Sequence, residues 1–212
     1  MIIKRNIVTP ELKTYIDKKI IPRYRKFDLA HNEDHVKYVI KQCIKLAKLY
    51  NVDLNMSYTI GAYHDLGLGK GREGHEKESA KILREDKNLK KWFNKDQIQI
   101  MADAVEDHRA SLEYEPRSIY GKIVSDADRV LDPEITIKRA INFGLANFPN
   151  STKEEHFNRV YNYLLSKYSE TGYAKFWLNK SDSFKKLEEF RKILRDKKKF
   201  LDIFNEIWED SQ

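Results

Sequence analysis

Histidine and aspartate residues in the first two thirds of the chain are of types that suit metal-assisted chemistry. Imidazole nitrogens and carboxylate oxygens together bind divalent ions such as Mn²⁺, Fe²⁺, Zn²⁺, Mg²⁺ or Co²⁺, and they leave coordination positions for water and a phosphate oxygen. This donor set therefore predicts metal-assisted hydrolysis of a phosphorylated substrate. The candidate residues are His35, the adjacent pair His64 and Asp65, His108 and Asp128.

The adjacent pair restricts how such a site can be built. Consecutive residues of an α-helix point about 100° apart, so His64 and Asp65 can share one ion only where a helix ends. Gly67 follows closely and supplies such an end. His35, near the start of its helix, and Asp128, from a later helix, must then approach from other elements. The pattern predicts a site inside a helical bundle.

Helical periodicity dominates the chain, and no convincing series of alternating strands is present. We predict an all-α fold with one structural domain: an N-terminal helix in residues 1–27, a metal-binding core in residues 28–132, and C-terminal helices in residues 133–212 that pack on the core. The better-defined helices are expected at Pro10 to Tyr24, Asp34 to Tyr50, Met56 to Leu66, Ile119 to Leu131, Thr152 to Tyr168 and Ser183 to Trp208. Further helices are expected after Gly74, Asn94 and Pro133.

The expected last helix carries an apolar stripe opposite a basic face. We expect the stripe to dock on the domain or on a second copy of the chain in a homodimer, and not on a membrane. Its members are Leu187, Phe190, Leu194, Leu201, Phe204 and Trp208.

Composition narrows the class of protein. The 212 residues are 41% apolar and 34% charged, and no run approaches the 18 apolar residues of a membrane-spanning helix. The first residues lack the apolar stretch of a secretory signal. The single cysteine, Cys43, lies on an apolar helical face and is expected to pack in the core. These features predict a cytoplasmic protein.

The net charge of +7 comes mainly from one segment. Between Lys185 and Lys199 there are eight Lys or Arg and three Asp or Glu residues. Such a run is usually the solvated face of a helix. We therefore do not expect nucleic acid as a partner.

Four sequence stretches resemble the HD-domain metal-dependent phosphohydrolases. They are His31-Asn32-Glu33-Asp34-His35-Val36, Ala62-Tyr63-His64-Asp65-Leu66-Gly67, His75-Glu76-Lys77-Glu78-Ser79-Ala80 and Ser125-Asp126-Ala127-Asp128-Arg129. The resemblance implies an all-helical fold and hydrolysis of phosphoester or phosphoanhydride bonds, commonly in nucleotides. It also implies that His35, His64, Asp65 and Asp128 hold a divalent metal ion.

Several neighbouring residues leave alternatives. His31 competes with His35, although His35 stands in the right place relative to the apolar run that follows it. Asp126 and Asp128 face about 200° apart on a helix, so only one of them should reach the metal. His75 and His108 raise the question of a second metal ion. We favour one ion, with local hydrogen bonds or phosphate contacts as the alternative role of these histidines.

Basic residues near these motifs are candidates for binding a substrate phosphate. The glycine-rich loop from Gly67 to Gly74 lacks the spacing of a P-loop. Lys70 or Arg72 could still present a positive charge to a phosphate, and the alternative is that the loop is an ordinary flexible turn. Arg109 and Arg129 are further candidates, since guanidinium matches phosphate bidentately. The alternative is that they pair with nearby carboxylates, Asp107 and Asp126 respectively.

The resulting hypothesis is hydrolysis of a nucleotide or related small phosphorylated molecule. A bound ion would activate water, and Asp65 or His108 would relay a proton. The alternative is a non-catalytic module that senses a metal or nucleotide. A di-iron oxygenase bundle requires two Glu-x-x-His pairs, which we do not find.

Overall fold

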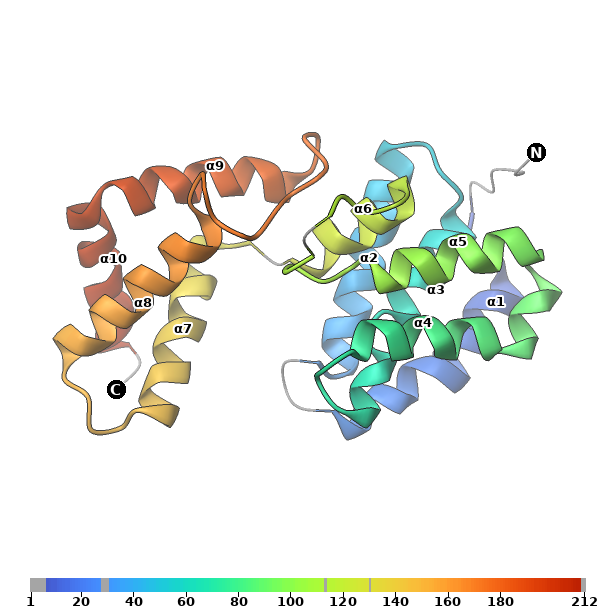
Figure 1. Ribbon diagram of the computed structural model, residues 1–212, viewed down its shortest axis with the longest axis horizontal. Coiled ribbons are helices and arrows are strands. Elements are labelled where there is room, and N and C mark those ends of the chain that lie inside the picture. The colour runs from blue at the N-terminus through green and yellow to red at the C-terminus, as the bar shows by residue number, and fades with distance from the viewer. Residues whose placement is uncertain (1–6, 28–30, 113, 130, 211–212) are drawn as a thin grey trace. The chain divides into compact units, whose positions relative to one another are not determined.

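The computed structural model describes residues 7–27, 31–112, 114–129 and 131–210, and within these ranges the regular elements are all helical (Figure 1). The predicted all-α class is therefore confirmed. The chain divides into two compact units, Met1–Arg129 and Val130–Gln212. Each unit is described by itself, and the packing of residues 133–212 on the core stays a prediction.

The first helical segment changes type along its length. An α-helix, α1 (Pro10–Tyr15), passes into a π-helical turn, η1 (Ile16–Ile20), and then into a 3₁₀ segment, η2 (Ile21–Lys26). The single helix expected from Pro10 to Tyr24 is thus wrong in type beyond Tyr15. Pro22 explains the change, because it has no N–H for an α-helical bond and its ring clashes with the preceding turn.

The two central helices of the first unit pack against each other: α2 (Glu33–Leu49) and α3 (Leu54–Tyr63). Asn32 caps α2 by accepting hydrogen bonds from the backbone N–H groups of Asp34 and His35. This cap places His35 in the first turn of the helix. Cys43 is buried on the inner face of α2, where burial raises the pKa of its thiol, so its predicted packing role is confirmed.

The end of α3 differs from the prediction. The helix stops at Tyr63 rather than Leu66, and Asp65 has left the helical conformation with φ −111° and ψ 8°. His64 and Asp65 therefore lie on the turn between α3 and the 3₁₀ helix η3 (Leu66–Lys70). The helix ends early enough for both side chains to point to the same place.

Four further elements follow in the first unit. They are α4 (His75–Glu85), η4 (Lys87–Lys91), α5 (Lys95–Glu106) and α6 (Ile119–Asp128). Helix α4 packs on η3 and α5, and α6 packs on α2, α3 and α5. Helices α2, α4, α5 and α6 thus all pack on α3.

The second unit contains α7 (Pro133–Asn147), α8 (Lys153–Tyr168), α9 (Asp182–Arg195) and α10 (Lys197–Glu209). The single helix predicted from Ser183 to Trp208 is wrong, because the chain breaks at Asp196 with φ −101° and ψ 90°. The Asp196 side chain then caps α10 by accepting from the Lys199 N–H. Aspartate favours such a cap over a helix interior.

This break changes which residues form the core of the second unit. Leu187, Phe190, Leu194 and Phe204 are buried as expected, but Leu201 is 39% exposed while Phe200 is fully buried. Because α9 and α10 are separate helices, the buried positions of α10 do not continue the helical spacing of those in α9. The stripe packs within its own unit, and a homodimer stays a prediction.

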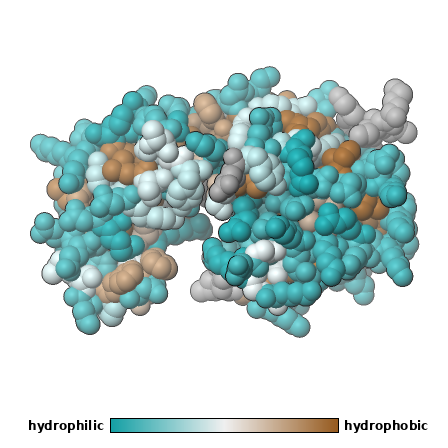
Figure 2. Space-filling model, in the orientation of Figure 1, coloured by the Kyte–Doolittle hydropathy of each residue, from teal (hydrophilic) through white to brown (hydrophobic). Residues whose placement is uncertain are grey.

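The face shown in Figure 2 is mostly hydrophilic, with separate apolar patches. None of the helices in the described ranges is long and apolar enough to cross a lipid bilayer.

The break at Asp196 predicts unequal effects of two neighbouring truncations. Phe200→Ala should lower the free energy of unfolding by about 3–5 kcal/mol, because it removes a fully buried ring. Leu201→Ala should cost less than about 1 kcal/mol, since that side chain is largely solvated. Urea denaturation followed by circular dichroism measures both. Equal losses, or a larger loss for Leu201→Ala, would contradict the interrupted helix.

Candidate metal centre

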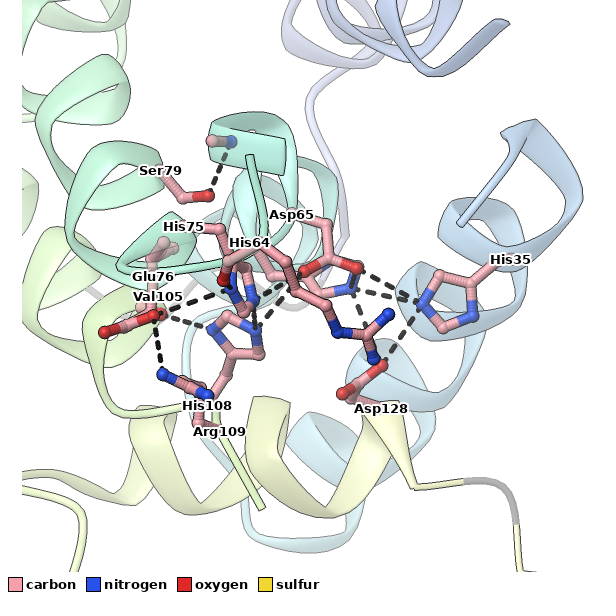
Figure 3. A network of polar contacts seen from close by, with 12 residues as sticks. His35, His64, Asp65, His75, Glu76, Ser79, Val105, His108, Arg109 and Asp128 are labelled. Carbon is pink, nitrogen blue, oxygen red and sulfur yellow. Dashed lines mark hydrogen bonds and ion pairs between the residues drawn. The ribbon is translucent and has the colours of Figure 1, made fainter. Parts of the chain in front are cut away.

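Six histidine and aspartate side chains converge beside the end of α3 (Figure 3). Their ligand atoms form two groups of potential metal ligands that share one residue. The first group is His35, His64, Asp65 and Asp128, and the second is Asp65, His75 and His108.

The first group joins α2, the turn after α3, and α6. The Nε2 atoms of His35 and His64 lie 3.3 Å apart. Oδ1 of Asp128 lies 3.1 Å from the His35 Nε2 and 3.6 Å from the His64 Nε2. Oδ2 of Asp65 lies 3.2 Å from the His64 Nε2 and 3.7 Å from the His35 Nε2. Two imidazoles and two carboxylates thus surround one position.

The second group joins the same turn to the start of α4 and the end of α5. The Nε2 atoms of His75 and His108 also lie 3.3 Å apart. Oδ1 of Asp65 lies 3.3 Å from the His75 Nε2 and 3.4 Å from the His108 Nε2. Asp65 therefore presents one carboxylate oxygen to each group, as Figure 3 shows.

Three of the four histidines are oriented by the same local hydrogen bond. Nδ1 of His64, His75 and His108 donates to the backbone carbonyl three residues earlier, at distances of 2.9, 2.9 and 2.6 Å. A carbonyl oxygen only accepts, so Nδ1 must carry the proton. The Nε2 lone pair of each neutral ring then faces the cluster, which is the arrangement found in metal-ligating histidines.

This arrangement fits a divalent cation. In the neutral rings, two Nε2 lone pairs face each other within each group and repel. A cation placed between them, either a metal ion or a proton, removes the repulsion. The donor set of imidazole and carboxylate suits a first-row divalent metal, so the cluster can hold one.

The sequence comparison supports the same reading. Residues 32–131 match the profile of the HD domain. These residues belong to the HD-domain superfamily. The chain is also similar to a solved structure described as a predicted HD superfamily hydrolase from an uncultured Thermotogales bacterium. That chain is 20% identical, with 94% of this chain and 90% of the other covered, at a TM-score of 0.49. No curated protein matches the sequence significantly.

The charges within the cluster shift the pKa values of its histidines and aspartates. Burial alone lowers the pKa of His64, but the negative charges of Asp65 and Asp128 and the hydrogen bonds to them outweigh burial and leave that pKa well above its ordinary value. The pKa values of His35 and His75 are raised by the same competition. Burial alone raises the pKa of Asp65 and of Asp128, yet the surrounding histidines hold both below the usual carboxyl range.

A close approach between two backbones brings His75 to Asp65. A Cβ atom on Gly67 would lie 2.1 Å from the His75 carbonyl oxygen and 2.7 Å from the Ser79 nitrogen. Only glycine fits there without a shift of α4. The Gly67 N–H also donates to Ser79 Oγ at 2.8 Å. The start of α4 is thereby held against the turn that carries Asp65.

Tyr24 is a buried residue near the cluster that sequence reasoning missed. Its hydroxyl donates to the Ala62 carbonyl at 3.0 Å and accepts from the Asp65 N–H at 3.3 Å. Both bonds hold the backbone at the end of α3, and the Tyr24 ring lies along that of His64. No local pattern connects η2 with this turn, because the two are neighbours only in the folded chain.

Glu76 and Arg117 were also missed, and they account for the pairing of two predicted residues. Glu76 is buried beside His75, with Oε2 lying 3.5 Å from the His75 Nδ1 and 3.4 Å from the Arg109 guanidinium. Arg109 therefore pairs with Glu76 and not with Asp107. Asp107 is fully buried and instead accepts from the Arg117 guanidinium at 2.7 Å.

The other predicted phosphate-binding residues lie around the cluster. Lys70 is exposed and pairs with Glu78 at 2.6 Å. Arg72 is exposed, and its carbonyl accepts from His75. Arg129 is 8% exposed and donates to Ser125 Oγ at 2.8 Å. Substrate binding by these residues stays a prediction.

The structure distinguishes His35 from His31 and Asp128 from Asp126. His31 makes an edge contact with the His35 ring but belongs to neither ligand group. Asp126 is buried and lies 3.9 Å from the Arg129 guanidinium, whereas Asp128 faces His35. The structure thus places His35 and Asp128, and not their neighbours, in the cluster.

Metal affinity should rise with pH, because metal must displace the protons that the raised histidine pKa values retain. We expect the apparent association constant for Mn²⁺ to grow about tenfold per pH unit for each proton displaced, from pH 6 to pH 8. Isothermal titration of chelator-stripped protein, in two buffers of different ionisation enthalpy, measures both affinity and proton release. An affinity that does not change with pH would contradict this electrostatic account.

Proposed function

We propose that this protein is a metal-dependent phosphohydrolase that acts on a phosphoester or phosphoanhydride of a nucleotide or related small molecule. The observation that carries the proposal is the Asp65 carboxylate, whose two oxygens each face a separate group of histidines. Such a shared carboxylate is suited to a pair of metal ions on one phosphoryl group. The structure therefore favours two ions over the one that the sequence suggested.

A divalent ion bound at this cluster supplies Lewis acidity toward a phosphoryl oxygen and acidifies a coordinated water. The chain's own residues determine where that chemistry takes place. His64 and Asp65 are buried, while His35 and Asp128 retain side-chain exposures of 17% and 26%. The first ligand group is therefore open to solvent at His35 and Asp128, and His64 and Asp65 form its inner wall.

The roles of Asp65 and His108 follow from which of their atoms are engaged. Both oxygens of Asp65 face ligand groups, and the His108 Nε2 faces Asp65 and His75 while its Nδ1 donates to Val105. Ligation and proton relay would compete for the same atoms. We therefore propose that both residues contribute to catalysis as ligands, which revises the proton-relay role expected from the sequence.

A second feature of the site supports a small substrate. A cavity of about 270 Å³ borders Glu76 and Arg109, next to the second ligand group. The Arg109 guanidinium is 40% exposed and is steadied by Glu76. It can contact a substrate phosphate from there, since a guanidinium matches a phosphate with two parallel hydrogen bonds. The adjoining Tyr114, half exposed, can pack on the non-reacting part of the substrate.

The two ligand groups predict a specific pattern of metal content. The wild-type protein should bind two ions per chain. His35→Ala should weaken the first ion and His75→Ala the second, each by more than about 100-fold in affinity, whereas Asp65→Ala should weaken both. Elemental analysis and equilibrium dialysis with Mn²⁺ measure this. His31→Ala is the matched control, because His31 touches the His35 ring without joining a ligand group.

Hydrolysis should follow the same residues. Release of phosphate or pyrophosphate from a panel of nucleotides should require Mn²⁺, Co²⁺, Zn²⁺ or Mg²⁺ and should stop with chelator. His64→Ala and Asp128→Ala should lower kcat/KM by more than about 100-fold, while His31→Ala should leave it within about threefold. Stoichiometric metal binding without turnover on any phosphorylated substrate would contradict the enzyme and favour a sensor module.

A further inference from the structure

The second unit contains a cavity of about 500 Å³ between helices α7 and α8. This volume lies within the range of pockets for small organic ligands. Helix α7 lines it with residues one turn apart, and α8 does the same. The lining residues are Thr136, Arg139, Ala140, Phe143, Phe148, Arg159, Tyr163, Lys167 and Tyr168. They all belong to residues 130–212, outside the metal cluster.

The charge of this cavity is one-sided. Three of its lining residues are cationic, namely Arg139, Arg159 and Lys167, and none is acidic. Across the described residues, no ion pair within 4.0 Å joins any of these three to a carboxylate. Arg139 is exposed, but Arg159 and Lys167 are partly buried, and cations drawn out of water are normally paired. An anion would supply the missing partner.

Arg159 is held in place without an acidic partner. Its Nη2 donates to the Ala140 carbonyl at 2.6 Å, and its guanidinium lies 5.9 and 5.8 Å from the ring centres of Phe143 and Phe148. The Nε atom is buried and makes no hydrogen bond within the described chain. Burial accordingly lowers the pKa of Arg159. The guanidinium thus lies beside the cavity without an acidic partner.

The Arg159 guanidinium can occupy its place only because residue 144 is glycine and has no side chain. A Cβ there would lie 2.0 Å from Arg159 Nη2 and 2.7 Å from Cζ. Glycine therefore leaves the space into which the guanidinium extends. On the other side, Lys167 Nζ lies over the Tyr163 and Tyr168 rings at 5.6 and 5.2 Å from their centres.

The aromatic rings complete the chemistry of the cavity. Phe143, Phe148 and Tyr163 are 58%, 46% and 42% exposed, which is unusual for rings of this size. Figure 2 shows an apolar patch over the C-terminal end of α7. Exposed rings beside unpaired cations suit a ligand that has both a flat apolar ring system and a negative group.

We propose that the cavity between α7 and α8 binds a small organic anion carrying an aromatic ring, such as a nucleotide, through Arg159 and Lys167. The ring packs against the aromatic side chains, and the phosphate, sulfonate or carboxylate group accepts from the two cations. This site is independent of the metal cluster, so it can exist whether or not the first unit hydrolyses phosphate esters.

The test uses the full chain with chelator present and two probes of the stated chemistry. AMP is titrated calorimetrically, and 8-anilinonaphthalene-1-sulfonate is titrated by fluorescence. Adenosine and inorganic phosphate carry the ring and the charge separately. We expect saturable binding of both probes, with adenosine and phosphate each weaker than AMP by about tenfold or more.

Three variants, each of which removes one positive charge, distinguish binding of AMP in the cavity from attraction by the overall positive charge of the protein. Arg159→Gln and Lys167→Gln should each weaken AMP binding by about tenfold or more, because a charge-assisted hydrogen bond is lost. Lys138→Gln is the matched control, since Lys138 is exposed on α7 but does not line the cavity, and should change affinity less than about twofold. Circular dichroism confirms that all three fold. Failure of both probes to bind saturably, or equal effects of the three variants, would overturn the proposal.

Discussion

The Asp65 carboxylate is the interaction on which the arrangement of the first unit depends. It lies at the end of α3, is nearly buried, and is faced by Nε2 atoms from four histidines on four separate elements. A buried carboxylate requires partners for both oxygens. Here each partner of the carboxylate is a histidine that could also bind a metal. The contacts that compensate the burial of Asp65 are therefore the same contacts that gather the potential metal ligands. The early end of α3, the glycine at position 67 and the Tyr24 hydroxyl all serve to present that carboxylate.

The cluster also couples protonation to metal binding. The neighbouring carboxylates raise the pKa values of His35, His64 and His75, and the histidines in turn hold the pKa values of Asp65 and Asp128 below the usual carboxyl range. The backbone bonds to Nδ1 orient three rings in advance. The ligand atoms of these rings are therefore oriented in advance, and binding of a metal ion would displace protons rather than reorganise the chain. This is the form of preorganisation expected of a catalytic metal site, in which ligand geometry is set by the surrounding fold.

The second unit has an apolar core and a separate cavity lined by cations and aromatic rings. Its core is made of apolar side chains from all four of its helices, with aromatic rings from α8 packing on α10. Outside that core, α7 and α8 bring cations and rings together without acids. The two sites differ in charge, because the cluster in the first unit places carboxylates beside its histidines, whereas no acidic residue lines the cavity in the second unit. A surface with unbalanced positive charge and exposed rings is better suited to a ligand than to bulk water.

Much of the first unit could be predicted from the sequence. Helical class followed from apolar spacing, and the residue types together with the resemblance to the HD domain indicated the four members of the first group of potential metal ligands. The interruption of the last helix at Asp196 was not predictable from the sequence. Apolar residues continue at helical spacing on both sides of it, and an aspartate is also common on the solvated face of an uninterrupted helix. The partner of Arg109 was also undetermined, since Glu76 lies 33 positions away in the chain.

By itself the sequence determined that helices of this periodicity form, that His35, His64, Asp65 and Asp128 are of the right types, and that the adjacent pair must stand at a helix end. These properties are local, because they depend on side-chain chemistry and on the 3.6-residue helical repeat. Only the tertiary structure decided that the two oxygens of Asp65 face different histidine pairs and that His75 and His108 form a second group. Those facts depend on how closely α4, α5 and α6 approach the end of α3, which is set by packing between elements distant in the chain.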